Sequence, residues 1–170
     1  HGHPCGSVIW SETSKRLEFG PDRRDTTVLQ TAIARLLGYR WPAELDPDMR
    51  LSDESRQLVA RCEPLLQFAD KDGIVCIPSV RGEETCADRL RALLAKAYGD
   101  EWSPALEHEL VVATGGKAKD LDDWLRNGFF EQHCKLFHHR PFVWHIWDGR
   151  KRDGFHALVN YHRLAAGDGQ

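Results

Sequence analysis

The sequence lacks any apolar run approaching the ~20 residues that a membrane-spanning helix requires. No basic stretch followed by an apolar one stands at its start, so no signal peptide is visible. It also lacks the GxGxxG, Walker and GxSxG patterns of dinucleotide sites, phosphate loops and serine hydrolases. We therefore expect no contact with a membrane and no enzyme of these three classes.

Paired cysteines are also missing from the sequence. The cysteines are odd in number, and no two have the CxxC spacing of redox or zinc motifs. They are Cys5, Cys62, Cys76, Cys86 and Cys134. A disulfide framework is not expected, and the reduced thiols favour a cytoplasmic location.

The remaining composition is that of an ordinary globular protein. The 170 residues are 41% hydrophobic and 29% charged, which excludes a disordered chain and allows one core. We expect a single domain or lobe over 1–170, and since the sequence starts at His1 rather than Met, a fragment of a longer chain. The expected parts are a poorly defined N-terminal segment, a helical part, a helix plus hairpin, and a tail. These parts are 1–24, 25–119, 120–163 and 164–170.

Hydrophobic periodicity predicts an α+β fold, mostly α-helical with a small C-terminal β-hairpin. Helices are expected to begin after Asp25, at Ser52 with a kink at Pro64, near Thr85, at Ser103-Pro104, and at Asp120 with an end near Phe137. Residues 39–48 are expected to form a linker. Short strands are expected at 8–10, 17–19, 73–78, 142–147 and 155–161, the last two forming the hairpin. A short helix is the alternative for 155–161.

Charge is distributed unevenly along the chain. The net charge of -3 excludes a strongly basic nucleic-acid binder as a description of the whole chain. Residues 1–130 hold 17 Lys/Arg against 22 Asp/Glu, whereas residues 131–163 hold 6 against 3 and six of the nine histidines. The C-terminal fifth of the chain is therefore the part best suited to binding an anionic partner.

Basic and aromatic residues at the end of the last helix and at the hairpin tip form the strongest candidate site. Lysine and arginine there would neutralise phosphates, while histidines and aromatic rings would stack or donate hydrogen bonds. A solvated surface with charges at its turns is the alternative. The candidate DNA-binding residues are Arg126, Lys135, His138, His139, Arg140, Arg150, Lys151 and Arg152.

The His and Cys content raises a metal site as an alternative. The candidate ligands are His133, Cys134, His138, His139 and His145, with a second group at His1, His3 and Cys5. Adjacent helical residues point about 100° apart, and the spacing is none of the recurring zinc arrangements. We therefore expect no metal, Cys134 in the core and the histidines on a wet polar face, with a zinc-stabilised domain left as an alternative.

Two catalytic arrangements also remain formally open. Cys134 or Cys86 could meet a histidine as a nucleophile pair. His139, Asn160 and His162 have the residue types of a His–Asn–His nuclease motif. Asn160 and His162 are only two residues apart, however, a spacing that is typical of one face of a strand.

Three consecutive segments resemble a known family. They are 122–137 (DDWLRNGFFEQHCKLF), 140–148 (RPFVWHIWD) and 154–163 (GFHALVNYHR). They are similar, in order, to a W/Y-L-R-x-x-F-F-x-x-H helix, an R-P-F/I-x-W segment and a strand ending in Y-H-R. These features occur in the C-terminal part of large bacterial adenine-specific DNA methyltransferases of the type IIG-like, type II restriction enzyme methylase subunit family, with BREX and DISARM relatives. Residues 27–42 also resemble the segment upstream, so the likeness covers most of 26–163.

This resemblance implies a C-terminal or accessory segment of a restriction–modification or phage-defence enzyme. The parent protein would use S-adenosylmethionine to methylate adenine in double-stranded DNA, and its partners here would be the methyltransferase and recognition domains of the same polypeptide. The family's catalytic Asn/Asp-Pro-Pro-Tyr/Phe motif is missing, because the chain has no Pro-Pro pair. No catalytic residue and no cofactor are therefore assigned to this segment, and a structural or protein-interaction module without DNA affinity is the alternative.

Overall fold

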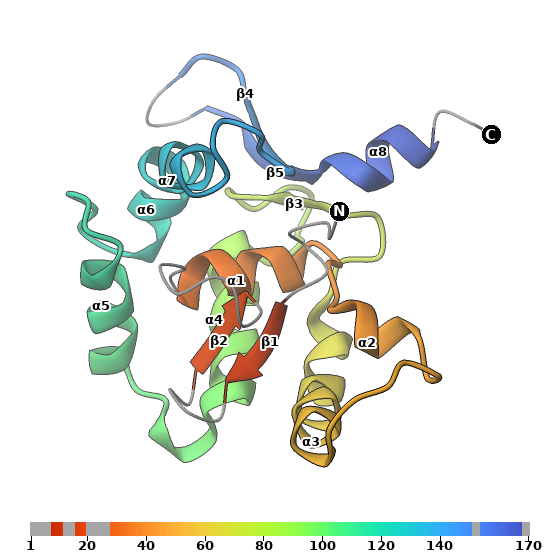
Figure 1. The fold of residues 1–170 in the computed structure, drawn as a ribbon. Coiled ribbons are helices and arrows are strands. Elements are labelled where there is room, and N and C mark those ends of the chain that lie inside the picture. Colours follow the sequence, from red (N-terminus) through yellow and green to blue (C-terminus); the bar gives the residue numbers. More distant parts are fainter. Residues whose placement is uncertain (1–7, 12–15, 20–27, 151–153, 168–170) are drawn as a thin grey trace.

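The computed structural model describes residues 8–11, 16–19, 28–150 and 154–167. The predicted fold class is confirmed: the protein is α+β and mostly helical, with a small antiparallel sheet near its C-terminus (Figure 1). Its elements in order are β1 (Val8–Ser11), β2 (Arg16–Phe19), α1 (Val28–Leu36), α2 (Pro42–Leu45), α3 (Asp53–Cys62), the 3-10 helix η2 (Glu63–Phe68), β3 (Ile74–Cys76), α4 (Cys86–Tyr98), the 3-10 helix η3 (Gly99–Glu101), α5 (Pro104–Ala113), α6 (Leu121–Asn127), α7 (Phe129–Leu136), β4 (Val143–Trp147), β5 (His156–Asn160) and α8 (Tyr161–Gly167).

Helix α1 is the centre of the structure. All nine of its residues are buried, which is the expected position for a helix that is apolar on nearly every side. Figure 1 shows α1 crossing the middle of the molecule with α4 beside it and the three-stranded sheet above. The core continues from α1 through α4, α6 and α7 to Leu158 of β5.

Local capping rules explain where most helices start. Ser52, Ser103 and Asp120 each accept a hydrogen bond from the backbone N–H three residues later, as predicted. Pro64 ends the regular helix as expected, because α3 stops at Cys62 and continues as a 3-10 turn.

The predicted linker 39–48 is wrong in one respect, because it contains the short helix α2. Its Glu44 carboxylate accepts the Trp41 N–H at 2.8 Å. The same carboxylate pairs with Arg35 of α1 at 2.7 Å, and both side chains are at most 3% exposed. This buried ion pair holds the linker against the central helix.

The predicted hairpin forms, and a third strand joins it. The sheet has the order β3-β5-β4, with antiparallel pairing throughout. Leu158 of β5 stands opposite both Val75 of β3 and His145 of β4. Every residue of β5 is buried, so the central strand is covered on both faces.

The helix predicted from Asp120 to about Phe137 is two helices, α6 and α7, that meet at Gly128. A Cβ atom at Gly128 would lie 2.8 Å from Cδ1 of Trp124. The Trp124 indole therefore occupies the side-chain space of position 128. Gly128 itself has φ -119, away from the helical value, so the helix axis breaks there.

The end of the last strand also differs from the prediction. The expected strand 155–161 ends at Asn160, and Tyr161 begins helix α8. Asn160 is the reason, since its side-chain oxygen accepts the backbone N–H groups of His162 (3.0 Å) and Arg163 (3.2 Å). An asparagine in this position caps a helix.

Among the residues that the structure describes, no helix combines the length and apolarity needed to cross a membrane.

Candidate functional site

The three segments that carry the family resemblance meet at the backbone of Phe142. The Phe142 N–H and the Val143 N–H both donate to Nε2 of His133, at 3.2 and 3.1 Å. The Phe142 carbonyl accepts from the Tyr39 hydroxyl at 2.7 Å and from the Tyr161 N–H at 3.1 Å. We call this cluster the Phe142 junction, made of Tyr39, His133, Phe142, Val143, Asn160 and His162. It joins α1, α7, β4 and α8.

His133 is the buried centre of this junction. Its ring lies within 5.2 Å, between centroids, of Phe129, Phe137 and Phe142. Burial lowers the pKa of His133 to about 3. Because Nε2 accepts two hydrogen bonds, the proton of the neutral ring lies on Nδ1, which donates to Oε1 of Gln30 at 3.1 Å.

The expectation that the histidines lie on a wet face with Cys134 in the core is therefore wrong for this pair. His133 is 1% exposed and Cys134 is half-buried. The physical reason is that an imidazole nitrogen can accept the two N–H groups at the start of β4, which a thiol would satisfy poorly.

Asn160 and His162 belong to the same junction. The Asn160 amide donates to the carbonyl of Leu37 at 2.8 Å, while its oxygen caps α8. Nδ1 of His162 lies 2.9 Å from the Tyr39 hydroxyl. These two side chains are used in holding α8 and the sheet against the end of α1, so they do not form the strand face that a His–Asn–His arrangement would need.

The Cys86 and Cys134 thiols are poorly suited to nucleophilic chemistry. Burial raises the pKa of Cys86 to about 12, and burial also raises the pKa of the Cys134 thiol. A nucleophilic cysteine needs the opposite shift, toward the thiolate at neutral pH. Within the described part of the chain, no three His, Cys, Asp or Glu side chains come together as a metal-binding group; His1, His3 and Cys5 lie outside it.

Two of the predicted DNA-binding residues lie on α6 and α7 in ion pairs. Arg126 contacts Asp122 at 2.9 Å, and its side chain is 16% exposed. Lys135 contacts Glu131 at 3.1 Å, with both side chains largely exposed. An exposed pair of this kind contributes little energy, so Lys135 can exchange its carboxylate for a phosphate at small cost.

His138, His139 and Arg140 form an exposed turn at the end of α7. His138 and His139 have positive φ angles of 52° and 61°. The left-handed conformation disfavours any side chain, and glycine adopts it without strain. His138 and His139 are two successive exposed residues in this conformation. Backbone strain of this kind is most often found at binding sites.

The hairpin tip carries Arg150, and Lys151 and Arg152 lie outside the described residues. The Asp148 carboxylate accepts the backbone N–H groups of Arg150 (3.0 Å) and Phe155 (3.2 Å), which lowers the pKa of Asp148. This acid is therefore engaged by its own turn. The Arg150 side chain is exposed.

Two histidines brace the tip from below. His145 Nε2 lies 2.8 Å from His156 Nδ1, and His156 Nε2 lies 3.2 Å from the Arg150 carbonyl. Burial, together with His156 and Arg126, lowers the pKa of His145 to about 4. The contact between the two imidazoles, and that of His156 with the Arg150 carbonyl, thus brace the hairpin.

Exposed aromatic and aliphatic side chains accompany these cations, and the sequence prediction did not name them. Trp144, Ile146, Trp147 and Phe155 are 43–48% exposed. The alternation of β4 could have indicated Trp144 and Ile146, since residues two apart share a face. We call the set the hairpin surface; it consists of Arg140, Trp144, Ile146, Trp147, Arg150 and Phe155.

Helix α7 and the hairpin surface lie on the same side of the molecule. Figure 1 shows β4 above α7. Phe130 of α7 packs against Trp144 and His145, at centroid distances of 5.9 and 6.3 Å. Helix α7 therefore packs directly against the strand that carries Trp144 and Ile146.

Comparisons of the chain with protein-family models, with curated proteins and with solved structures give no match.

Proposed function

We propose that this chain is a C-terminal or accessory segment of an S-adenosylmethionine-dependent, adenine-specific DNA methyltransferase of a restriction–modification or phage-defence system. Its part would be to contact double-stranded DNA through the hairpin surface and the 138–140 turn, beside the recognition domain. The observation that carries the proposal is the joint exposure of aromatic rings and cations on one braced hairpin. Such surfaces suit phosphate contact and stacking.

The family resemblance supports the same proposal in a specific way. One residue of each motif, His133, Phe142 and His162, belongs to the Phe142 junction. In this proposal they fix the angle between α7 and β4, and the exposed residues of the hairpin surface face DNA.

The rest of the proposal concerns the parent protein. S-adenosylmethionine and the methyltransferase domain would belong to the parent chain, and this segment would carry no catalytic residue. The expected location is the cytoplasm, where such enzymes meet DNA.

Duplex binding at several salt concentrations tests the proposal. Affinity of the 170-residue chain should be weak, insensitive to sequence and steeply dependent on salt, since each neutralised phosphate contributes a log–log slope of about -0.9. Replacing Arg150, Lys151 and Arg152 by alanine should weaken binding to all sequences and flatten the slope by about 2. Fluorescence anisotropy with two unrelated duplexes measures both quantities.

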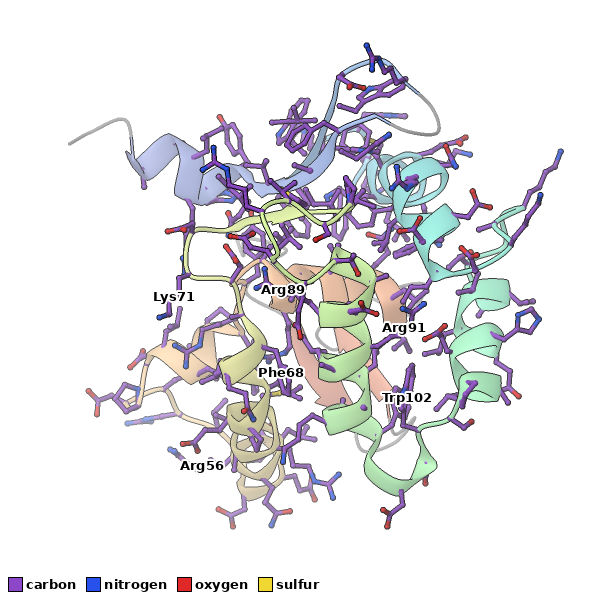
Figure 2. The ribbon with its side chains drawn as sticks, turned by 180° about the vertical axis from the view of Figure 1, so that it is seen from behind. Arg56, Phe68, Lys71, Arg89, Arg91 and Trp102 are labelled. Atoms are coloured by element: carbon purple, nitrogen blue, oxygen red, sulfur yellow. The ribbon has the colours of Figure 1, made fainter. Side chains whose placement is uncertain are left out.

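A matched triple variant provides the control. Arg56, Lys71 and Lys96 are exposed cations on other parts of the molecule, and Figure 2 shows Arg56 and Lys71 far from the hairpin. Their replacement by alanine removes the same charge and should leave the slope nearly unchanged. Equal slopes in the two triple variants would contradict DNA contact at the hairpin tip.

A protein-interaction role is the second candidate, and the exposed apolar face of the sheet favours it. Ile74 of β3 and Ile146 of β4 are 45% and 48% exposed, and contiguous exposed apolar patches mark protein-interaction sites. Absence of any duplex binding at low salt would select this candidate.

A further inference from the structure

A groove separate from the Phe142 junction and the hairpin surface lies between the 114–119 loop and the meeting point of α6 and α7. Its volume is about 600 Å³, within the usual range for small-molecule sites. Its walls include Lys117 of the loop, Trp124 and Gly128 at the helix break, and Lys135 of α7.

Trp124 brings an unpaired hydrogen-bond donor to this groove. The residue is 1% exposed, and its Nε1–H has no acceptor among the described residues. Buried donors are nearly always paired, and a tryptophan N–H can only donate. An unpaired one in the wall of a groove points to a ligand that supplies the acceptor.

Gly128 places no side chain against the polar edge of that indole. Its φ of -119 is open to any residue, so the backbone conformation does not require glycine. The close approach of Trp124 is what requires glycine, because a Cβ atom at position 128 would lie 2.8 Å from Cδ1 and 3.5 Å from Nε1 of Trp124. The Cδ1–Nε1 edge therefore faces the wall that Gly128 forms.

The charged side chains of the groove are two lysines, Lys117 and Lys135, and two carboxylates, Asp123 and Glu131. Asp123 accepts from the Asn127 amide at 2.7 Å and from the Lys119 N–H at 2.9 Å. Glu131 is paired with Lys135. The Lys117 ammonium has no partner among the described residues, so both unpaired groups of the groove are donors.

We propose that this groove binds a phosphate group, with the Lys117 ammonium and the Trp124 Nε1–H as its donors. The phosphate would belong to a nucleotide-sized ligand, as the volume allows, or to the backbone of a DNA strand. The site goes beyond the proposed function, because it uses none of the hairpin residues.

The indole N–H signals of the ¹⁵N-labelled 170-residue chain provide the test. The sequence has six tryptophans, and the Trp124 signal is the one missing from Trp124→Phe; through-space assignment of the unaltered chain identifies it if that variant does not fold. Titration with inorganic phosphate, against chloride at constant ionic strength, should shift this signal to saturation. Lys117→Ala should weaken the phosphate affinity about 10-fold, as expected for a hydrogen bond to a charged group.

Lys119→Ala is the matched control, since it removes the same charge from the same exposed loop without removing a groove residue. It should leave the phosphate affinity unchanged. An unshifted Trp124 signal, or equal effects of the two lysine variants, would overturn the site.

A second titration with a short duplex identifies the source of the phosphate. If the duplex also shifts the Trp124 signal, the phosphate comes from DNA. If only inorganic phosphate shifts it, the phosphate comes from a small ligand. Loss of duplex binding alone would overturn the proposed function and leave this site standing.

Discussion

Replacing His133 with alanine is expected to lower the free energy of unfolding by about 4 kcal/mol. The change leaves the N–H groups of Phe142 and Val143 and the amide oxygen of Gln30 without this partner, at about 1–3 kcal/mol for each group left unsatisfied. It also opens a cavity among three phenylalanine rings, which adds to the cost.

Chemical denaturation at pH 8 measures this effect. The control is His108→Ala on α5, where the side chain is exposed and the expected change is within about 0.5 kcal/mol. A loss below about 1 kcal/mol in His133→Ala would mean that the junction is not what holds β4 to α7.

The same residue predicts how stability depends on pH. The unfolded chain takes up a proton on His133 near pH 6.5, whereas the folded protein resists protonation until its pKa of about 3. Stability is therefore complete above pH 6.5 and falls as the pH falls toward 3. His133 should contribute a loss of about 2 kcal/mol between pH 8 and pH 5. His145, whose pKa is also lowered, acts in the same direction, so His133→Ala should reduce the pH dependence without abolishing it.

Asn160→Asp is expected to cost about 3 kcal/mol, although the two residues cap helices equally well. Aspartate retains the oxygen that accepts the His162 and Arg163 N–H groups. It loses the N–H that donates to the Leu37 carbonyl and places a buried charge against that oxygen.

The Asn160→Asp substitution separates two roles of the side chain, the cap of α8 and the hydrogen bond to the Leu37 carbonyl at the end of α1. Gln57→Glu, the same amide-to-acid change at an exposed position of α3, is the control and should change stability by less than about 0.5 kcal/mol. A stable Asn160→Asp variant would show that only the cap matters, and that α8 is not held to α1 through this side chain.

The features that the sequence predicted correctly depend on neighbours close in the chain. Ser52, Ser103 and Asp120 were recognised as caps because the capping bond spans three residues. The hairpin strands were recognised by their β-branched and aromatic residues.

The features that it missed depend on distant contacts. At the break at Gly128, the Trp124 indole fills the side-chain space, a contact that a helical pattern does not contain. The burial of His133 depends on Gln30, 103 positions earlier. For the candidate site, the cations could be read from charge, but the exposure of Trp147 and Phe155 required knowledge of which side of the hairpin the core occupies.

The most direct test of DNA contact at the 138–140 turn is the duplex affinity of a His138→Gly, His139→Gly variant. Glycine relieves left-handed strain worth about 1 kcal/mol per residue, partly offset by its freedom in the unfolded chain, so the variant should be at least as stable as the unaltered protein. If the imidazoles contact DNA, duplex affinity at low salt should nevertheless fall by about 10-fold, equivalent to about 1.4 kcal/mol. Retained stability with weakened binding is the predicted result, and unchanged duplex affinity would contradict the proposed interface.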